Sequence, residues 1–257
     1  MSGTVILKWG GGLITRKSKL CEANYGVIDS LSEICRRFDK NLVIIHGAGS
    51  FGHLKAKKYR LAEGNIPGID QNTGVKEVRN DMLELNSIVV KSLQNHGLSV
   101  MSYPPHKWAT GTGPNFSGEL PIHEGITVVY GDVVDDSEKG FGILSGDDLM
   151  FRYATELLDV ERAVFAIGGV DGILRVPPEH AKPEDLIEVW SPQMEFEGEH
   201  ASDIDVTGGI GLKAARGAMI AEKGVDVLII NGEIPERVLS AINGQSVKGT
   251  RIVSGNS

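Results

Sequence analysis

The segment HGAGSFGH at residues 46–53 combines a bare backbone with two imidazoles, directly after the apolar run LVII. Its small residues leave room for backbone N–H groups to approach an anion, and an imidazole can donate a hydrogen bond to the same anion. We therefore predict an anion site at this loop, with His53 at its far edge. His46 ends the apolar run, and we expect it to be a buried structural residue.

Two further glycine clusters occupy comparable positions. KWGGG at 8–12 follows the apolar run TVIL, and DVTGGIGLK at 205–213 opens an amphipathic stretch. Taken alone, each cluster could supply turn or helix-capping glycines that need a positive φ. Because loops at the carboxyl ends of parallel strands meet at one edge of a sheet, the three clusters together predict a shared site for anionic groups.

Lys8 and Lys213 lie beside two of these clusters in a protein that is acidic overall. A lone lysine is usually a solvated surface residue, but beside a phosphate loop it can neutralise the charge of a phosphoryl group in transfer. The chain lacks the GxxxxGK[ST] pattern of a P-loop. The residues therefore indicate phosphoryl chemistry with a different phosphate-binding design.

Short apolar runs alternate with longer amphipathic segments, which is typical of βαβ units around a mostly parallel sheet. Strands are predicted at 4–8, 42–46, 98–102, 126–130, 162–167 and 225–230, and helices at 24–38, 76–95, 147–158 and 208–223. No linker divides the sequence. We therefore expect residues 1–257 to form a single α/β domain.

Charge and length limit the classes of partner. The chain has 257 residues and a formal net charge of −8. Nucleic acids and anionic membrane surfaces are bound by basic faces, so this charge argues against both as main partners. No apolar run approaches the length of about 20 residues that spans a bilayer. We expect a cytoplasmic protein that acts on small molecules.

Seven segments together resemble the amino acid kinase superfamily, and within it the isopentenyl phosphate kinases. In chain order they are KWGGGLITRKS, VIIHGAGSFGH, YGDVV, ILSGDDLM, VDGIL, DVTGGIGLKAA and INGEIPERV. The histidine that ends SFGH favours this branch, since superfamily members that phosphorylate carboxylates lack it. The resemblance implies a three-layer αβα sandwich with a mostly parallel central sheet, a homodimer, ATP with Mg²⁺, and phosphoryl transfer to isopentenyl phosphate.

The resemblance also implies a role for individual residues. The implied catalytic residues are Lys8, Lys17, His53, Asp147 and Lys213. The implied ATP-binding residues are Lys8, Gly10, Gly11, Gly12, Gly49, Gly169, Asp171, Gly172, Gly209, Gly211 and Lys213. The implied substrate-binding residues are Ala48, Gly49, His53, Gly131, Gly146 and Asp147. No protein ligand for a metal is expected, so Mg²⁺ would be held mainly by ATP oxygens and water. The N-terminal part would bind mainly the acceptor and the C-terminal part mainly ATP.

The sequence departs from the family pattern in two places. Gly168 and Gly169 stand where a Thr-Asp pair is usual, and the histidine loop reads HGAG rather than HGGG. In the SGDD segment, Asp147 and Asp148 suit either a helix N-cap or the orientation of the lysines.

One alternative concerns a set of apolar residues with helical spacing, which suits an isoprenoid pocket but fits an ordinary core better: Val75, Val78, Met82 and Leu85.

Two other functions also stay open. One is a related kinase with another small acceptor, such as a fosfomycin kinase. The other is a non-catalytic sensor of nucleotides or amino acids on the same fold.

Overall fold

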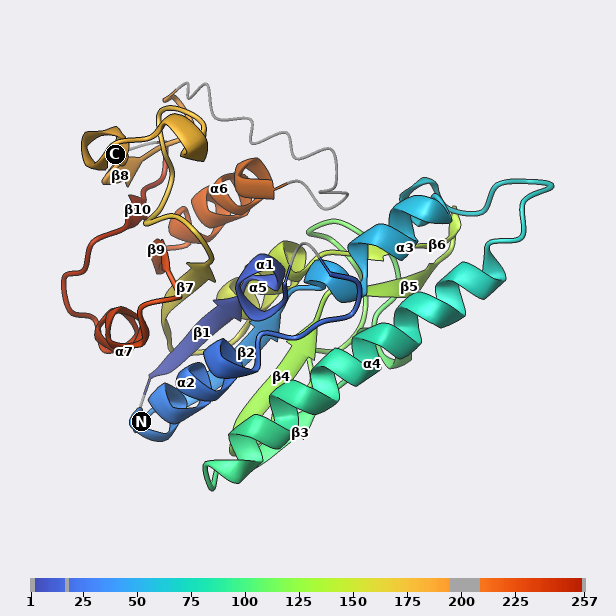
Figure 1. The fold of residues 1–257 in the computed structure, drawn as a ribbon, viewed down its shortest axis with the longest axis horizontal. Helices are drawn as coiled ribbons and strands as arrows, with labels where there is room; N and C mark the ends of the chain where they lie inside the picture. The colour runs from blue at the N-terminus through green and yellow to red at the C-terminus, as the bar shows by residue number, and fades with distance from the viewer. Residues whose placement is uncertain (1–2, 17–18, 195–208, 256–257) are drawn as a thin grey trace.

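The computed structural model describes residues 3–16, 19–194 and 209–255 (Figure 1). Its main sheet has eight strands in the order β3-β4-β2-β1-β7-β9-β10-β8. In that order they are Val100–Ser102, Ile126–Tyr130, Asn41–His46, Thr4–Trp9, Val160–Ile167, Asp226–Asn231, Thr250–Ile252 and Val189–Trp190. All neighbours pair in parallel except β9 and β10, which pair antiparallel. The predicted mostly parallel sheet is confirmed.

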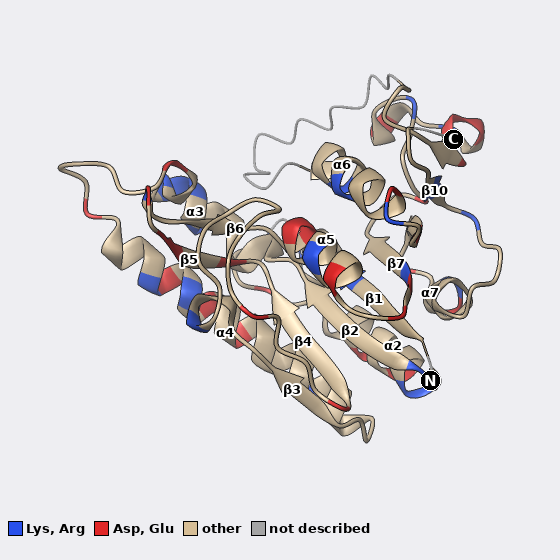
Figure 2. Cartoon of the chain, turned by 180° about the vertical axis from the view of Figure 1, so that it is seen from behind, with Lys and Arg blue, Asp and Glu red and all other residues tan. Residues whose placement is uncertain are grey.

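Helices cover both faces of this sheet. Along β1, Val5 and Leu7 pack into one hydrophobic cluster and Ile6 packs into another, because successive side chains of a strand point to opposite faces. The first cluster includes residues of α2 (Tyr25–Arg36), α4 (Asn72–Asn95) and α7 (Pro235–Ile242). The second includes residues of α5 (Gly146–Glu156) and α6 (Gly209–Ala221). Figures 1 and 2 show these helices from the two sides, which confirms the predicted three-layer αβα architecture.

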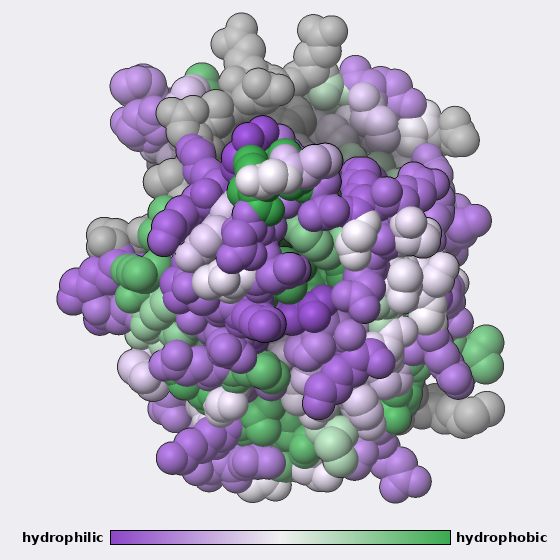
Figure 3. All heavy atoms as spheres, turned by 90° about the vertical axis from the view of Figure 1, so that its right-hand side faces the viewer, coloured by the Kyte–Doolittle hydropathy of each residue, from purple (hydrophilic) through white to green (hydrophobic). Residues whose placement is uncertain are grey.

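Buried strands explain why the apolar runs are uninterrupted. Strands of a parallel sheet with helices on both faces have no solvent side, so they need no polar alternation. The molecular surface differs from these strands in hydropathy on the face that Figure 3 shows. Hydrophilic side chains predominate on that face, and hydrophobic ones form small separate groups. None of the helices in the described ranges combines the length and apolar character needed to cross a bilayer.

The six predicted strands and four predicted helices are present, with ends that differ by a few residues. Several shorter elements were not predicted. They are α1 (Gly11–Ile14), α3 (His53–Lys58), α7, the strands β5 (Asp132–Asp136), β6 (Gly140–Leu144), β8 and β10, and the short 3-10 turns. Elements of two to eight residues carry too few positions for a period to be read. β5 and β6 form an antiparallel hairpin outside the main sheet.

The register of the sheet brings the carboxyl ends of four strands together. Trp9 of β1 lies beside His46 of β2 and Ala166 of β7, and His46 lies beside Tyr130 of β4. The loops that follow these strands therefore begin at the same edge. This is where the sequence predicts an anion site, and it is where the structure has a cavity.

Candidate active site

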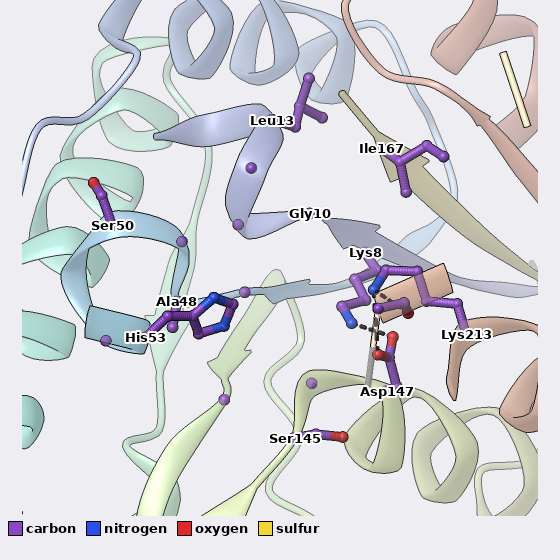
Figure 4. Close-up of a pocket in the computed structure, with 18 of the residues that line it drawn as sticks. Lys8, Gly10, Leu13, Ala48, Ser50, His53, Ser145, Asp147, Ile167 and Lys213 are labelled. Carbon is purple, nitrogen blue, oxygen red and sulfur yellow. Dashed lines mark hydrogen bonds and ion pairs between the residues drawn. The ribbon is translucent and has the colours of Figure 1, made fainter. Parts of the chain in front are cut away.

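A cavity of ≈ 600 Å³ opens at the carboxyl edge of the sheet (Figure 4). Most of the residues that the sequence assigned to a site line it. They are Lys8, Gly10, Gly11, Gly12, Ala48, Gly49, His53, Gly131, Gly146, Asp147, Gly209 and Lys213. The cavity thus joins the loops after β1, β2 and β4 to the first turns of α5 and α6.

One end of the cavity is built around a buried carboxylate. Lys8, at the end of β1, forms an ion pair with Oδ1 of Asp147 in the first turn of α5. Lys213 of α6 places its Nζ 3.4 Å from Oδ2 of the same carboxylate and 3.0 Å from the carbonyl oxygen of Gly209. Figure 4 shows the three side chains converging. Two cations are therefore held side by side at the cavity wall.

The charge of Asp147 depends on these lysines. Burial by itself would raise its pKa, but the positive charges of Lys213 and Lys8 outweigh burial and hold the pKa below its usual range. The carboxylate stays ionised at neutral pH and fixes both ammonium groups. A glycine at position 146 gives Lys8 its space, because a Cβ there would lie 3.1 Å from Cε of Lys8.

The two glycine loops pack directly on each other. A Cβ on Gly11 would collide with the backbone nitrogen of Gly49, and a Cβ on Gly49 would collide with Oγ1 of Thr15. Gly49 also has φ of +50°, a conformation that other residues rarely adopt. Oγ1 of Thr15 donates to the carbonyl oxygen of Gly11 and accepts from the N–H of Ser50, so it bridges the loops. Thr15 was not singled out from the sequence, because the pattern around it carries no sign of a distant partner.

Free backbone donors line this part of the cavity. Within the described ranges, the N–H groups of Gly11, Gly12, Ala48 and Gly49 have no hydrogen-bond partner. Gly49 is buried, Gly11 and Ala48 are half-buried and Gly12 is exposed, so a ligand or water can satisfy these donors. All four N–H groups can therefore donate to an anion that enters between the loops.

His53 enters the cavity from the other side. It is the first residue of α3, and in Figure 4 its ring points into the space opposite the Lys8, Asp147 and Lys213 cluster. The helix continues with Lys55, Lys57 and Lys58, the blue segment of α3 in Figure 2. A positive helix beside the cavity favours an anionic ligand in a protein of net negative charge.

The wall next to His53 is apolar. Val78 and Met82 of α4 line the cavity together with Val133 of β5 and Ile143 of β6. Met82 lies close to the residue before His53, since a Cβ on Gly52 would be 3.4 Å from Sδ of Met82. Val78 and Met82 also belong to the core cluster on that face of the sheet, as do Val75 and Leu85. The preference for a core role is confirmed for all four residues, and two of them additionally form the cavity wall.

Two interpretations of the sequence can now be refined. His46 is fully buried and stacks on Tyr130, in agreement with a structural position. The helix N-cap of α5 is Ser145 rather than either aspartate, because its hydroxyl accepts from the N–H of Asp148. Asp148 instead accepts from Arg216 Nε at 2.6 Å, which ties α5 to α6.

The sequence of this chain is similar to those of known proteins. A profile described as "Amino acid kinase family" matches residues 3–231, most of the chain. The chain belongs to the amino acid kinase family. It is 33% identical to the isopentenyl phosphate kinase of Methanothermobacter thermautotrophicus over 96% of this chain and 98% of that protein. It is 32% identical to the isopentenyl phosphate kinase of Thermoplasma acidophilum over 96% and 99% of the two chains.

A solved structure agrees with these sequence relatives. A crystal structure of an isopentenyl phosphate kinase superposes with a TM-score of 0.82 at 31% identity, covering 97% of this chain and 100% of that one. The resemblance and the fold predicted from the sequence are confirmed for this member of the amino acid kinase family.

Some predicted site residues do not border the cavity. Gly169, Asp171, Gly172 and Gly211 are not among its lining residues, and Lys17 lies outside the described residues. Asp171 instead forms ion pairs with Arg237 at 2.5 Å and Lys248 at 2.7 Å. Burial would raise the pKa of Asp171, but Lys248 and Arg237 together lower it. Their roles in nucleotide binding stay predictions.

Other lining residues were missed. They are mainly apolar or belong to an irregular connection: Leu13, Ile167, Gly168, Val170, Pro177, Pro178, Glu179 and Ile210. Gly168 stands out in the sequence only as a departure from the family pattern, which does not assign it to the site. Val170, Pro177, Pro178 and Glu179 carry no chemical signal in the sequence, because their position depends on how the connection after β7 returns to the sheet. Leu13, Ile167 and Ile210 are apolar residues of α1, β7 and α6.

Proposed function

We propose that this protein is an ATP-dependent kinase that phosphorylates isopentenyl phosphate to isopentenyl diphosphate. One observation carries the proposal. The cavity joins His53 and an apolar wall at one end to the Lys8, Asp147 and Lys213 cluster at the other. An acceptor with a phosphate head and a hydrocarbon tail matches the first end, and a transferring phosphoryl group matches the second. The named relatives support the same activity.

Each residue has a role that follows from its chemistry. His53 donates a hydrogen bond to the acceptor phosphate, and the N–H groups of Ala48 and Gly49 bind its remaining oxygens. No general base is needed, because a phosphate monoester is already ionised near neutral pH. Lys8 and Lys213 neutralise charge that develops when two anions approach each other. Asp147 keeps both lysines in place.

The nucleotide half is proposed from the remaining lining residues. Gly10, Gly11 and Gly12 carry no side chain that would block the ATP phosphates, the N–H groups of Gly11 and Gly12 can donate to these phosphates, and Gly209 and Lys213 approach from α6. ATP supplies the phosphoryl group when bound. Among the described residues no group of carboxylates, histidines or cysteines is arranged to hold a metal. Since Asp147 and Asp148 are already paired with cations, Mg²⁺ would be bound mainly by phosphate oxygens and water.

Several wider properties belong to the same proposal. We propose that residues 1–257 act as a single domain, with acceptor binding mainly in the N-terminal part and ATP binding mainly in the C-terminal part. The protein would be a cytoplasmic homodimer. Size-exclusion chromatography with light scattering would measure the assembly state, and a monomer at micromolar concentration would contradict that part.

The acceptor is tested with a panel of substrates. ADP release is measured with ATP and, in turn, isopentenyl phosphate, fosfomycin, glutamate, aspartate and UMP. Turnover of isopentenyl phosphate is expected. Turnover with fosfomycin alone would favour a kinase for another small acceptor, and ATP binding without any turnover would favour a sensor.

The role of His53 is tested in the same assay. His53→Ala should lose about 2 kcal/mol or more of transition-state stabilisation toward isopentenyl phosphate, the value of a hydrogen bond to a charged group. ATP affinity should be nearly unchanged, and His53→Gln, which keeps a neutral donor, should recover part of the loss. A His53→Ala variant with wild-type kcat/KM for isopentenyl phosphate would contradict this role.

A further inference from the structure

His46 has contacts that a merely space-filling residue would not need. It ends β2 and directly precedes the loop proposed to bind the acceptor phosphate. Its Nδ1 lies 3.2 Å from the carbonyl oxygen of Gly47. On the other side of the ring, the amide oxygen Oδ1 of Asn86 lies 3.4 Å from Nε2 and accepts from Oγ of Ser102 at 3.0 Å. Both ring nitrogens of His46 therefore face polar groups inside the core.

The ring is neutral in this environment. Burial lowers the pKa of His46 to about 4. Tyr130 stacks on the ring, and its own pKa is raised by burial and by Asp132, so Tyr130 is uncharged too. Among the described residues none forms an ion pair with His46. A neutral imidazole carries one proton, so only one of its two nitrogens can donate.

The carbonyl group of Gly47, which is the nearer of the two acceptors, favours a proton on Nδ1. A carbonyl oxygen accepts hydrogen bonds and never donates, so a bond to Gly47 requires the proton on Nδ1. The Asn86 amide can face the ring with either its oxygen or its nitrogen. With the NH₂ group turned toward the ring, it would donate to Nε2 of His46 and to Oγ of Ser102. Both ring nitrogens of His46 would then have a partner.

This hydrogen bond sets the direction of one peptide plane. The described chain has no cis peptide bonds, so the N–H of Ala48 points opposite the C=O of Gly47. Gly47 has no side chain to restrict rotation of that plane. When His46 draws the carbonyl toward the buried ring, the N–H of Ala48 is left on the opposite edge. Ala48 lines the cavity, and in the described part of the chain its N–H has no partner.

We propose that His46 is a positioning residue for phosphoryl transfer: as the Nδ1–H tautomer it holds the Gly47 carbonyl and aims the Ala48 N–H at the acceptor phosphate. The identity of that acceptor rests on the proposed function. The tautomer of His46 and its hydrogen bond to Gly47 do not depend on which acceptor is bound.

The first test measures the tautomer without any substrate. Protein labelled with ¹⁵N-histidine is studied by long-range ¹H–¹⁵N correlation, and the His46 signals are assigned by their absence from the His46→Asn variant. We expect an Nδ1–H pattern that stays unchanged between pH 8 and about pH 5.5, because burial keeps the ring neutral. An Nε2–H pattern, or protonation within that range, would overturn the inference.

The second test uses two variants that each keep one donor position. The amide nitrogen of Asn at position 46 takes the place of Nδ1, whereas that of Gln takes the place of Nε2. We expect His46→Gln to lose about tenfold or more in kcat/KM for isopentenyl phosphate, as when a backbone donor to a transition state is misaligned. His46→Asn should keep most of that activity. KM for ATP should stay near the wild-type value in both.

The outcomes separate a positioning role from a structural one. Both variants lose the ring that stacks on Tyr130, so a purely structural histidine would give equal losses of activity and of melting temperature. Equal kcat/KM in the two variants, or a change confined to KM for ATP, would therefore overturn the inference. If the wild type does not turn over isopentenyl phosphate, the proposed function fails, and the tautomer measurement still decides the role of His46.

Discussion

Asp147 offers the sharpest test of how the site is built, through the substitution Asp147→Asn. The side chain of Asp147 is 2% exposed, and those of Lys8 and Lys213 are 6% and 14% exposed. At 3.4 Å, the Lys213 pair alone corresponds to about 5 kcal/mol at an effective dielectric constant of about 20. Part of this attraction is offset by desolvation, and breaking a buried pair typically costs about 3–5 kcal/mol. We expect Asp147→Asn to lower the free energy of unfolding by that amount.

The loss should depend on pH in a defined direction. The pKa of Asp147 is lower in the folded protein than in the unfolded chain, so its stabilisation is complete above pH about 4 and fades as pH falls below that value. Urea denaturation of the wild type and the variant should therefore differ at pH 7 and converge toward pH 3. Asp135→Asn is the control, because Asp135 is 75% exposed and its ion pair with Arg79 is worth less than about 1 kcal/mol.

Activity provides the second readout for Asp147→Asn. Without the carboxylate the two ammonium groups repel each other and move apart, and a displacement of about 1 Å can lower kcat/KM by about 10²-fold. ADP release with saturating ATP measures this loss. If Asp147→Asn matched Asp135→Asn in both stability and kcat/KM, the lysines would be held by other contacts and the reasoning would be refuted.

Three further predictions concern the loops, the nucleotide lysine and the metal. Gly49→Ala should destabilise by more than about 2 kcal/mol, because φ is +50° and the new methyl would collide with Thr15, whereas Gly211→Ala, with open space around it, should be neutral or stabilising in urea denaturation. Lys213→Ala should weaken transition-state stabilisation by about 1.5–3 kcal/mol, which lowers kcat/KM by about tenfold to more than a hundredfold. Unchanged kinetics would show that Lys213 does not belong to the site. Excess EDTA should abolish turnover and added Mg²⁺ should restore it, with no metal retained by the dialysed protein in mass spectrometry. Turnover without free Mg²⁺ would contradict this.

The parts of the fold and the site that follow from local sequence could be predicted. An apolar run of five or six residues followed by glycine specifies a buried strand and a bare loop, because both depend on neighbours in sequence. Lys8 at the end of β1 and the loop at 47–52 were found in this way. Parallel pairing then requires that these loops meet at one edge, so the general place of the site could also be predicted.

The partners of individual side chains depend on the tertiary structure. Asp147 lies 139 residues from Lys8 and 66 residues from Lys213, and apart from the family resemblance no local pattern in the chain relates the three. The same holds for Thr15, which bridges to Ser50 over 35 residues, and for Asp171, which turns to Arg237 instead of the cavity. Burial and charge pairing between distant elements decide these contacts, since a carboxylate that leaves water must find a cation wherever the packed helices and strands bring one within reach.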